Sequence, residues 1–247
     1  MEGMLKLYSP INELKQIGED IWIVDGNEIH MSFKLFKVPF TTRMTIVKID
    51  NNKLWIHSPI AFNKELNDKI KELGDIEHIV APNKYHYSYV LDWYNHYPNA
   101  KVWLAKGVST KLKIDKIENF VSLDNISKTS WSEEIYFIPF RGSIAMEEMV
   151  FFHKKSSTLI LTDLIESIEV NKLPLLYKLV FKFGDNKYPK FRTSRDLRSS
   201  FIFKKQAKDS YSKIESWKPD KIVFSHGKII LENGTEKLKE AFYWLRK

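Results

Sequence analysis

The stretch that decides the fold begins Leu54-Trp55-Ile56-His57-Ser58-Pro59 and ends Val102-Trp103-Leu104. Both ends read as short apolar strands, and a third strand, His78-Ile79-Val80, lies between them. The first connection predicts a helix that begins at the N-cap Asn63 and runs through Leu73; the second predicts a helix over 88–97. Strands that alternate with helices favour a parallel sheet with right-handed crossovers, so we expect an α/β fold.

The flanking sequence extends this pattern in both directions. Strands are expected over 21–24, 43–49, 135–139, 149–153, 158–162 and 221–224, and helices over Ser194–Ile214 and 235–246. The strand over 43–49 and the one at 54–57 form a hairpin candidate, and 135–139 is expected to pair with 149–153. We find no repeat and no Gly/Ser linker, so we expect one domain over 1–247. The apolar, basic segment Pro174–Phe183 fits a core helix, a lid over a site or an interfacial surface, and we favour the first two.

Composition excludes several function classes. The chain has no cysteine, which rules out disulfide scaffolds, Cys-ligated zinc, iron–sulfur clusters and thiol nucleophiles. No apolar run approaches the ~20 residues that span a bilayer, so no transmembrane segment is expected. The N-terminus lacks an apolar signal core, and we expect a cytoplasmic protein. The net charge of +8 comes mostly from scattered lysines, which do not favour nucleic acid as a partner without excluding it.

Three polar residues follow apolar runs where an open α/β sheet places its ligands. These are His86, Asp163 and His226. Two imidazoles and a carboxylate suit one zinc or iron(II) ion with coordination positions left open. Such an ion acidifies water and polarises an attacked carbonyl or phosphoryl group. The alternative for each residue alone is structural: a strand-end His is often a hydrogen-bonded loop residue, and an Asp there often caps a helix.

The order of these motifs resembles a known family. Besides the two stretches already quoted, it rests on Ala81-Pro82-Asn83-Lys84-Tyr85-His86, Phe151-Phe152-His153, Ser157-Thr158-Leu159-Ile160-Leu161-Thr162-Asp163-Leu164 and Ser225-His226-Gly227. Together they look like a divergent branch, with a domain of unknown function, of the metallo-β-lactamase-like hydrolase/oxidoreductase superfamily. The resemblance is strongest over 21–244. It implies a four-layer αββα sandwich with its site at the edge of two sheets.

The resemblance also implies which ligands are kept. The superfamily signature H-x-H-x-D-H falls on Ala81, Asn83, Tyr85 and His86, so only its last histidine remains. Asp163 matches the bridging aspartate and His226 the final histidine ligand. The histidine expected before Phe151 is replaced, with Ile144 at or near its position and Glu147 or Glu148 close by.

This pattern of loss leaves two interpretations of the site. Either one ion is held by His86, Asp163 and His226, or the pocket holds no metal. Tyr85 stands where the family has an aspartate, and it either donates a hydrogen bond to a substrate or fills the vacant position.

Four further residues complete the candidate site. Glu148 is a candidate general base, and Asn83 is a candidate pocket residue. His57 stands where the family has a bracing aspartate. His153 is either a pocket residue or a buried structural imidazole.

The sequence therefore predicts a metal-dependent hydrolase-like protein with at most one ion. The expected reaction is attack of water on an ester, amide or phosphoester of an unidentified small molecule. The alternative is a catalytically degenerate member that binds a ligand or a partner.

Overall fold

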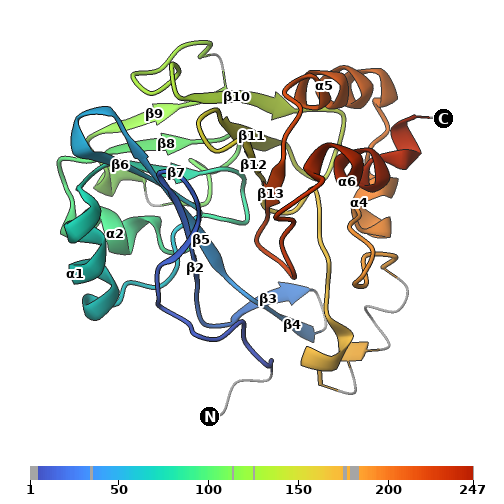
Figure 1. Cartoon of the computed structure of the whole chain (residues 1–247), viewed down its shortest axis with the longest axis horizontal. Helices are drawn as coiled ribbons and strands as arrows, with labels where there is room; N and C mark the ends of the chain where they lie inside the picture. The colour runs from blue at the N-terminus through green and yellow to red at the C-terminus, as the bar shows by residue number, and fades with distance from the viewer. Residues whose placement is uncertain are drawn as a thin grey trace.

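Two mixed β-sheets form the centre of the molecule, with helices on both outer sides (Figure 1). The computed structural model describes residues 5–33, 36–112, 114–124, 126–174, 177–178 and 184–246. The first sheet has the order β1 (Lys15–Gly18), β2 (Ile21–Asp25), β5 (Arg43–Ile49), β6 (Lys53–His57), β7 (Asp75–Ala81), β8 (Lys101–Leu104) and β9 (Phe120–Ser122). The second has the order β10 (Ile135–Phe140), β11 (Glu148–His153), β12 (Thr158–Ile160) and β13 (Lys221–Val223).

Strand direction decides where the loops emerge. Strands β6, β7, β8 and β9 run parallel to one another, as the alternation of strands and helices predicts. In the second sheet β12 and β13 are parallel, whereas β11 is antiparallel to β12. A separate antiparallel pair, β3 (Ile29–Phe33) and β4 (Phe36–Phe40), lies below the two sheets in Figure 1.

Helices cover the outer face of each sheet. On one side lie α1 (Lys64–Leu73) and α2 (Val90–His96); on the other lie α4 (Arg195–Ser199), α5 (Lys204–Ser216) and α6 (Gly234–Ala241) (Figure 1). Helix α1 begins as predicted, because the Asn63 side chain accepts a hydrogen bond from Leu66 N. It ends at Gly74, where φ is +156° and a β-carbon would lie 2.1 Å from the Asn52 carbonyl oxygen. The four-layer αββα sandwich expected from the sequence is confirmed.

Alternation along β11 shows how the layers are joined. Met149 and Phe151 pack into the core that also holds the first sheet, and Val150 and Phe152 pack into the core beneath α5 and α6. All six residues of β11 are buried, which explains why Met149-Val150-Phe151-Phe152 is a continuous apolar run rather than an alternating one.

The prediction of a single helix over Ser194–Ile214 is wrong. The structure has α4 and α5 instead, separated by residues 200–203. The backbone there bonds to another loop: Ile144 N donates to Ser200 O at 3.0 Å, and Phe203 N donates to Gly142 O at 3.1 Å. These tertiary hydrogen bonds replace the helical ones. The Pro174–Phe183 segment lies mostly outside the described residues.

Candidate functional site

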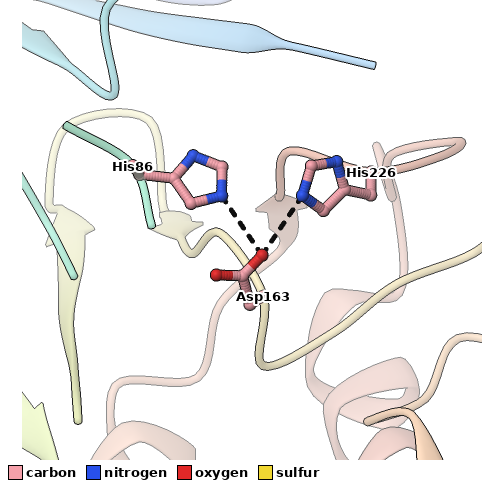
Figure 2. Close-up of side chains that lie close together, drawn as sticks. All are labelled: His86, Asp163 and His226. Atoms are coloured by element: carbon pink, nitrogen blue, oxygen red, sulfur yellow. Dashed lines mark hydrogen bonds and ion pairs between the residues drawn. The ribbon is translucent and has the colours of Figure 1, made fainter. Parts of the chain in front are cut away.

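Three loops bring His86, Asp163 and His226 to one point between the sheets. His86 follows β7, Asp163 follows β12 and His226 follows β13. His86 Nε2 lies 3.1 Å from Asp163 Oδ1, and His226 Nε2 lies 3.2 Å from the same oxygen. Figure 2 shows the two imidazoles pointing at the carboxylate from opposite sides. One ligand atom from each residue lies within 4.8 Å of the others, so the three are close enough to share one ion.

The outer ring nitrogens fix the orientation of both imidazoles. His226 Nδ1 lies 3.0 Å from the Thr41 carbonyl oxygen, which can only accept, so Nδ1 carries the proton. In the neutral ring, Nε2 then presents its lone pair to Asp163. His86 Nδ1 lies 2.7 Å from Ser58 Oγ. A metal-binding histidine usually has such a partner on its second nitrogen, so this donor set fits a divalent ion.

Asn83 connects the loop of His86 to Asp163. Its fully buried side chain accepts hydrogen bonds from Tyr85 N at 2.8 Å and His86 N at 3.0 Å through Oδ1. Its Nδ2 donates to Asp163 Oδ2 at 2.8 Å and to Thr162 Oγ1 at 2.9 Å. Asn83 therefore fixes the positions of the His86 loop and of Asp163, and its side-chain oxygen already accepts from two backbone amides.

Glu148 braces Asp163 from the second sheet. The register of β11 and β12 puts it opposite Asp163, and its oxygens accept from Thr162 N at 2.7 Å and Asp163 N at 2.9 Å. Burial and the charge of Asp163 raise the pKa of Glu148 to about 7, against the lowering effect of these amides. Burial would also raise the pKa of Asp163, but His86 and His226 outweigh it and hold that pKa well below its usual range.

A cavity of about 270 Å³ opens on the imidazole side of the site. His86, His226, Ser58 and Tyr85 are among the residues that line it, so a molecule in the cavity would contact both imidazoles. The Tyr85 side chain is 40% exposed. Partial burial raises the pKa of Tyr85, and Asp163 and Asp196 add to this, so its hydroxyl stays protonated and able to donate.

The segment before Phe151 supplies no further ligand at this point. Ile144 is 66% exposed, and its amide bonds to Ser200 O. Glu147 pairs with Arg141 at 3.6 Å. Of the described residues that could hold an ion, only His86, Asp163 and His226 form such a group.

The two other histidines of the predicted site, His57 and His153, lie in different places. His57 ends β6, next to Ser58, and stacks on Trp55 with ring centroids 5.5 Å apart. Burial, with a smaller effect from His86, lowers the pKa of His57 to about 3, so it is neutral. His153 pairs with Thr158 at the start of β12, whereas Asp163 follows the end of that strand. Of the two alternatives for His153, the pocket position is wrong, and the structure shows a buried structural imidazole: the ring bonds to Ser156 Oγ at 2.7 Å and does not line the cavity.

The sequence did not predict two residues that position the histidines of the site, Ser58 and Arg43. Ser58, beside His86, has φ of +52°, an uncommon left-handed conformation for a serine. Arg43 in β5 donates from Nη1 to the carbonyls of Phe224 at 2.6 Å and Gly227 at 3.0 Å, on either side of His226. An Arg in an alternating strand carries no signal for such a contact, but Ser58-Pro59 directly after a strand marks a loop at the active edge.

None of the helices in the described part of the chain has the length and apolar character needed to cross a membrane.

Comparison with known proteins places this site in a structural context. No curated protein sequence matches the chain. The fold is similar to that of the metallo-β-lactamase DIM-1, with TM-score 0.61 and 13% identity over 97% of this chain and 100% of that one. A metallo-β-lactamase from Pontibacter korlensis gives TM-score 0.58 and 11% identity over 98% and 100% of the two chains. The FIM-1 metallo-β-lactamase from Pseudomonas aeruginosa, in its mono-zinc form, gives 0.55 and 12% over 92% of each.

These likenesses show a metallo-β-lactamase-like fold. A family model, described as a domain of unknown function, DUF4336, matches residues 19–200. The chain therefore belongs to the DUF4336 family.

Proposed function

We propose that this protein is a metal-dependent hydrolase-like protein with a reduced site that holds at most one ion. The observation that carries the proposal is the convergence of His86, Asp163 and His226 within 4.8 Å, with the outer nitrogen of each ring already bonded. Zinc or iron(II) suits this donor set. The mono-zinc form of the FIM-1 metallo-β-lactamase gives a precedent for one ion in a related fold.

When bound, such an ion acidifies water and polarises a carbonyl or phosphoryl oxygen. The residues around it have separate tasks in the proposal. His86 and His226 offer nitrogen lone pairs at the cavity, and Asp163 supplies the negative charge. Tyr85, at the cavity wall, donates a hydrogen bond to the oxygen of an ester, amide or phosphoester on which charge develops.

Glu148 and Asn83 act through Asp163 in this proposal. Both contact that residue directly, and neither lines the cavity. We therefore assign Glu148 to positioning in place of the general-base role expected from the sequence. His57 has a similar supporting place: it is buried next to Ser58, and its neutral ring adds no positive charge near the three candidate ligands.

Elemental analysis tests the metal directly. Protein purified without chelator should contain close to one equivalent of zinc or iron, and the double variant His86→Ala/His226→Ala should contain almost none. The control is His96→Ala, because His96 is exposed on α2, where it bonds to Asp92 O and stacks on Phe62, and it does not line the cavity. Equal, near-zero metal in the wild type and the double variant would overturn the proposal.

One observation favours a binding protein as the second candidate. Asp163 Oδ1 lies within hydrogen-bonding distance of both imidazoles, so with protonated rings the three side chains satisfy one another without an ion. Hydrolysis assays on p-nitrophenyl acetate and p-nitrophenyl phosphate separate the candidates. Turnover that requires added metal and disappears in the double variant supports the hydrolase. A metal-loaded protein without turnover on any ester or amide panel supports the binding protein.

A further inference from the structure

The cavity beside His86 and His226 has a one-sided charge. Its described lining includes two lysines, and it includes no aspartate or glutamate. The carboxylates near the cavity lie outside its lining. Asp163 is bonded to the two imidazoles, and Glu28 pairs with His30, with 3.6 Å between Oε1 and Nε2. Asp196 and Asp92 are near enough for their charges to add to the effect of burial in raising the pKa of Tyr85 and Tyr89. An anion entering this cavity therefore meets positive groups that face no competing carboxylate in the lining.

Lys84 and Lys111 supply this positive charge. Lys84 lies in the loop after β7, immediately before Tyr85, and its ammonium lies 5.4 Å from the Tyr85 ring centroid. Lys111 lies in the loop after β8, and that loop packs beside Lys84, because a β-carbon on Gly107 would lie 4.0 Å from Lys84 Cβ. In the described part of the chain no carboxylate pairs with either lysine, whereas many other surface lysines have an acidic partner. Their N–H groups are available to a ligand.

The loop after β8 has its conformation fixed by hydrogen bonds within the loop. Lys111 N donates to Val108 O at 2.8 Å, and Thr110 Oγ1 donates to Gly107 O at 2.9 Å. The left-handed Gly107, with φ of +78°, allows this turn. The backbone that carries Lys111 is thus set at the cavity rim.

Aromatic rings form much of the rest of the wall. Tyr85, Tyr87 and Tyr89 alternate along one loop, and all three line the cavity. Tyrosine rings offer flat apolar surface for a planar group, and their hydroxyls offer hydrogen bonds. A volume of about 270 Å³ suits a metabolite-sized molecule.

From this lining we infer that the cavity takes a small anionic substrate, one that carries a phosphate or carboxylate group next to a planar ring. Lys84 and Lys111 grip the anionic group, and the tyrosines pack against the ring. This inference rests on the proposed function for the reaction itself, and it adds the substrate class and two specificity-determining residues.

Binding to metal-free protein tests the inference apart from the metal. Metal is removed by chelation and desalting, and phenyl phosphate, benzoate and the neutral benzyl alcohol are titrated in by calorimetry at low and high salt. We expect both anions to bind, benzyl alcohol to bind much more weakly, and the affinity for the anions to fall with salt. Lys84→Gln and Lys111→Gln should each weaken anion binding about fivefold, and the double variant about 20-fold, the upper range for exposed ion pairs. If only one of the two anions responds to the lysines, that anion is the recognised group.

Lys128→Gln is the matched control. It removes the same charge from a side chain that is 79% exposed and does not line the cavity, so anion affinity should stay unchanged. Equal affinity in the wild type and the double lysine variant would overturn the inference. Binding that appears only in zinc-loaded protein, and ignores both lysines, would also overturn it while supporting the proposed function. Lysine-dependent binding in a protein that never takes up metal would support the inference and overturn the proposed function.

Discussion

Replacing Asn83 with alanine should damage both stability and metal binding, because this side chain joins the loop of His86 to Asp163. The substitution removes the acceptor for the amides of Tyr85 and His86, and it removes the donor to Asp163 Oδ2. All of these contacts lie at a fully buried side chain, so water cannot easily replace them.

The expected loss follows from the number and type of the hydrogen bonds. The three neutral bonds, to the amides of Tyr85 and His86 and to Thr162 Oγ1, contribute about 1 kcal/mol each, and the bond to the carboxylate contributes about 2 kcal/mol, which gives about 5 kcal/mol in total. Loss of support behind metal ligands commonly weakens metal affinity by about 10–100-fold. We therefore expect both a large drop in the free energy of unfolding, measured by urea titration of metal-free protein, and a zinc affinity lower by at least tenfold, measured by competition with a chromophoric chelator.

Asn67→Ala is the control for this prediction. Asn67 is also a buried asparagine, but it lies on α1 and its side chain accepts a hydrogen bond from the Tyr97 hydroxyl. Its replacement should cost about 1 kcal/mol and leave zinc affinity unchanged. The reasoning fails if Asn83→Ala costs no more than Asn67→Ala, or if it leaves zinc affinity at the wild-type value.

Three further predictions concern other parts of the structure. Asp25→Ala removes the carboxylate that lies 2.7 Å from the Arg43 guanidinium, which is 3% exposed and therefore stays buried without its ion-pair partner. Urea titration should show that the free energy of unfolding falls by about 3–5 kcal/mol, and a fall below about 1 kcal/mol would contradict this expectation. Gly227→Ala would put a β-carbon 2.1 Å from the Ser167 carbonyl oxygen at φ of +109°, so the loop that carries His226 must move. We expect a lower melting temperature and weaker zinc retention. Wild-type values for both would show that the loop tolerates the change. Burial lowers the pKa of His153 from 6.5 to about 4, so as the pH falls the unfolded chain binds a proton at this histidine before the folded protein does. The contribution of His153 to the free energy of unfolding is therefore fully present above pH 6.5 and is lost as the pH drops towards 4. This histidine can account for a loss of at most about 3 kcal/mol in the free energy of unfolding. Urea titrations at several pH values should show that the free energy of unfolding falls less steeply with pH in His153→Phe than in the wild type. Equal slopes in the two proteins would refute the assignment of this pH dependence to His153.

The sequence pattern was sufficient to predict an α/β fold and the convergence of the three candidate ligands, for one geometric reason, whereas the four-layer arrangement was implied by the family resemblance. His86 and Asp163 follow strands that have a parallel neighbour, and His226 follows the parallel partner of β12. The carboxyl ends of parallel strands meet at one edge, so polar residues placed directly after them come together.

The sequence left two interpretations open for His153, because a single strand does not reveal its own direction. Phe151-Phe152-His153 ends in the same way as Trp55-Ile56-His57, but β11 is antiparallel to β12. Its last residue therefore lies at the opposite edge, and its first residue, Glu148, lies at the site. The apolar run at 149–152 has no feature that distinguishes the two directions.

The supporting hydrogen bonds could not be predicted from the sequence. Asn83 and Asp163 are 80 residues apart, and Arg43 and Phe224 are 181 apart. These contacts depend on the final distance between loops, and a change of less than an ångström decides whether a bond forms. The break between α4 and α5 has the same cause, since the bonds of Ser200 and Phe203 to the 142–144 loop appear only in the assembled molecule.

The order of the three side chains along the polypeptide has a consequence for biosynthesis. His86 and Asp163 leave the ribosome well before His226, which lies in the last strand–loop–helix unit of the 247 residues. Until that unit docks through Arg43, a nascent chain has only half of the histidine nitrogens that face Asp163. The three-ligand centre that the proposed function requires is therefore complete only after residue 226 has been synthesised and its loop has docked, and a polypeptide that ends before residue 226 carries most of the scaffold without that centre.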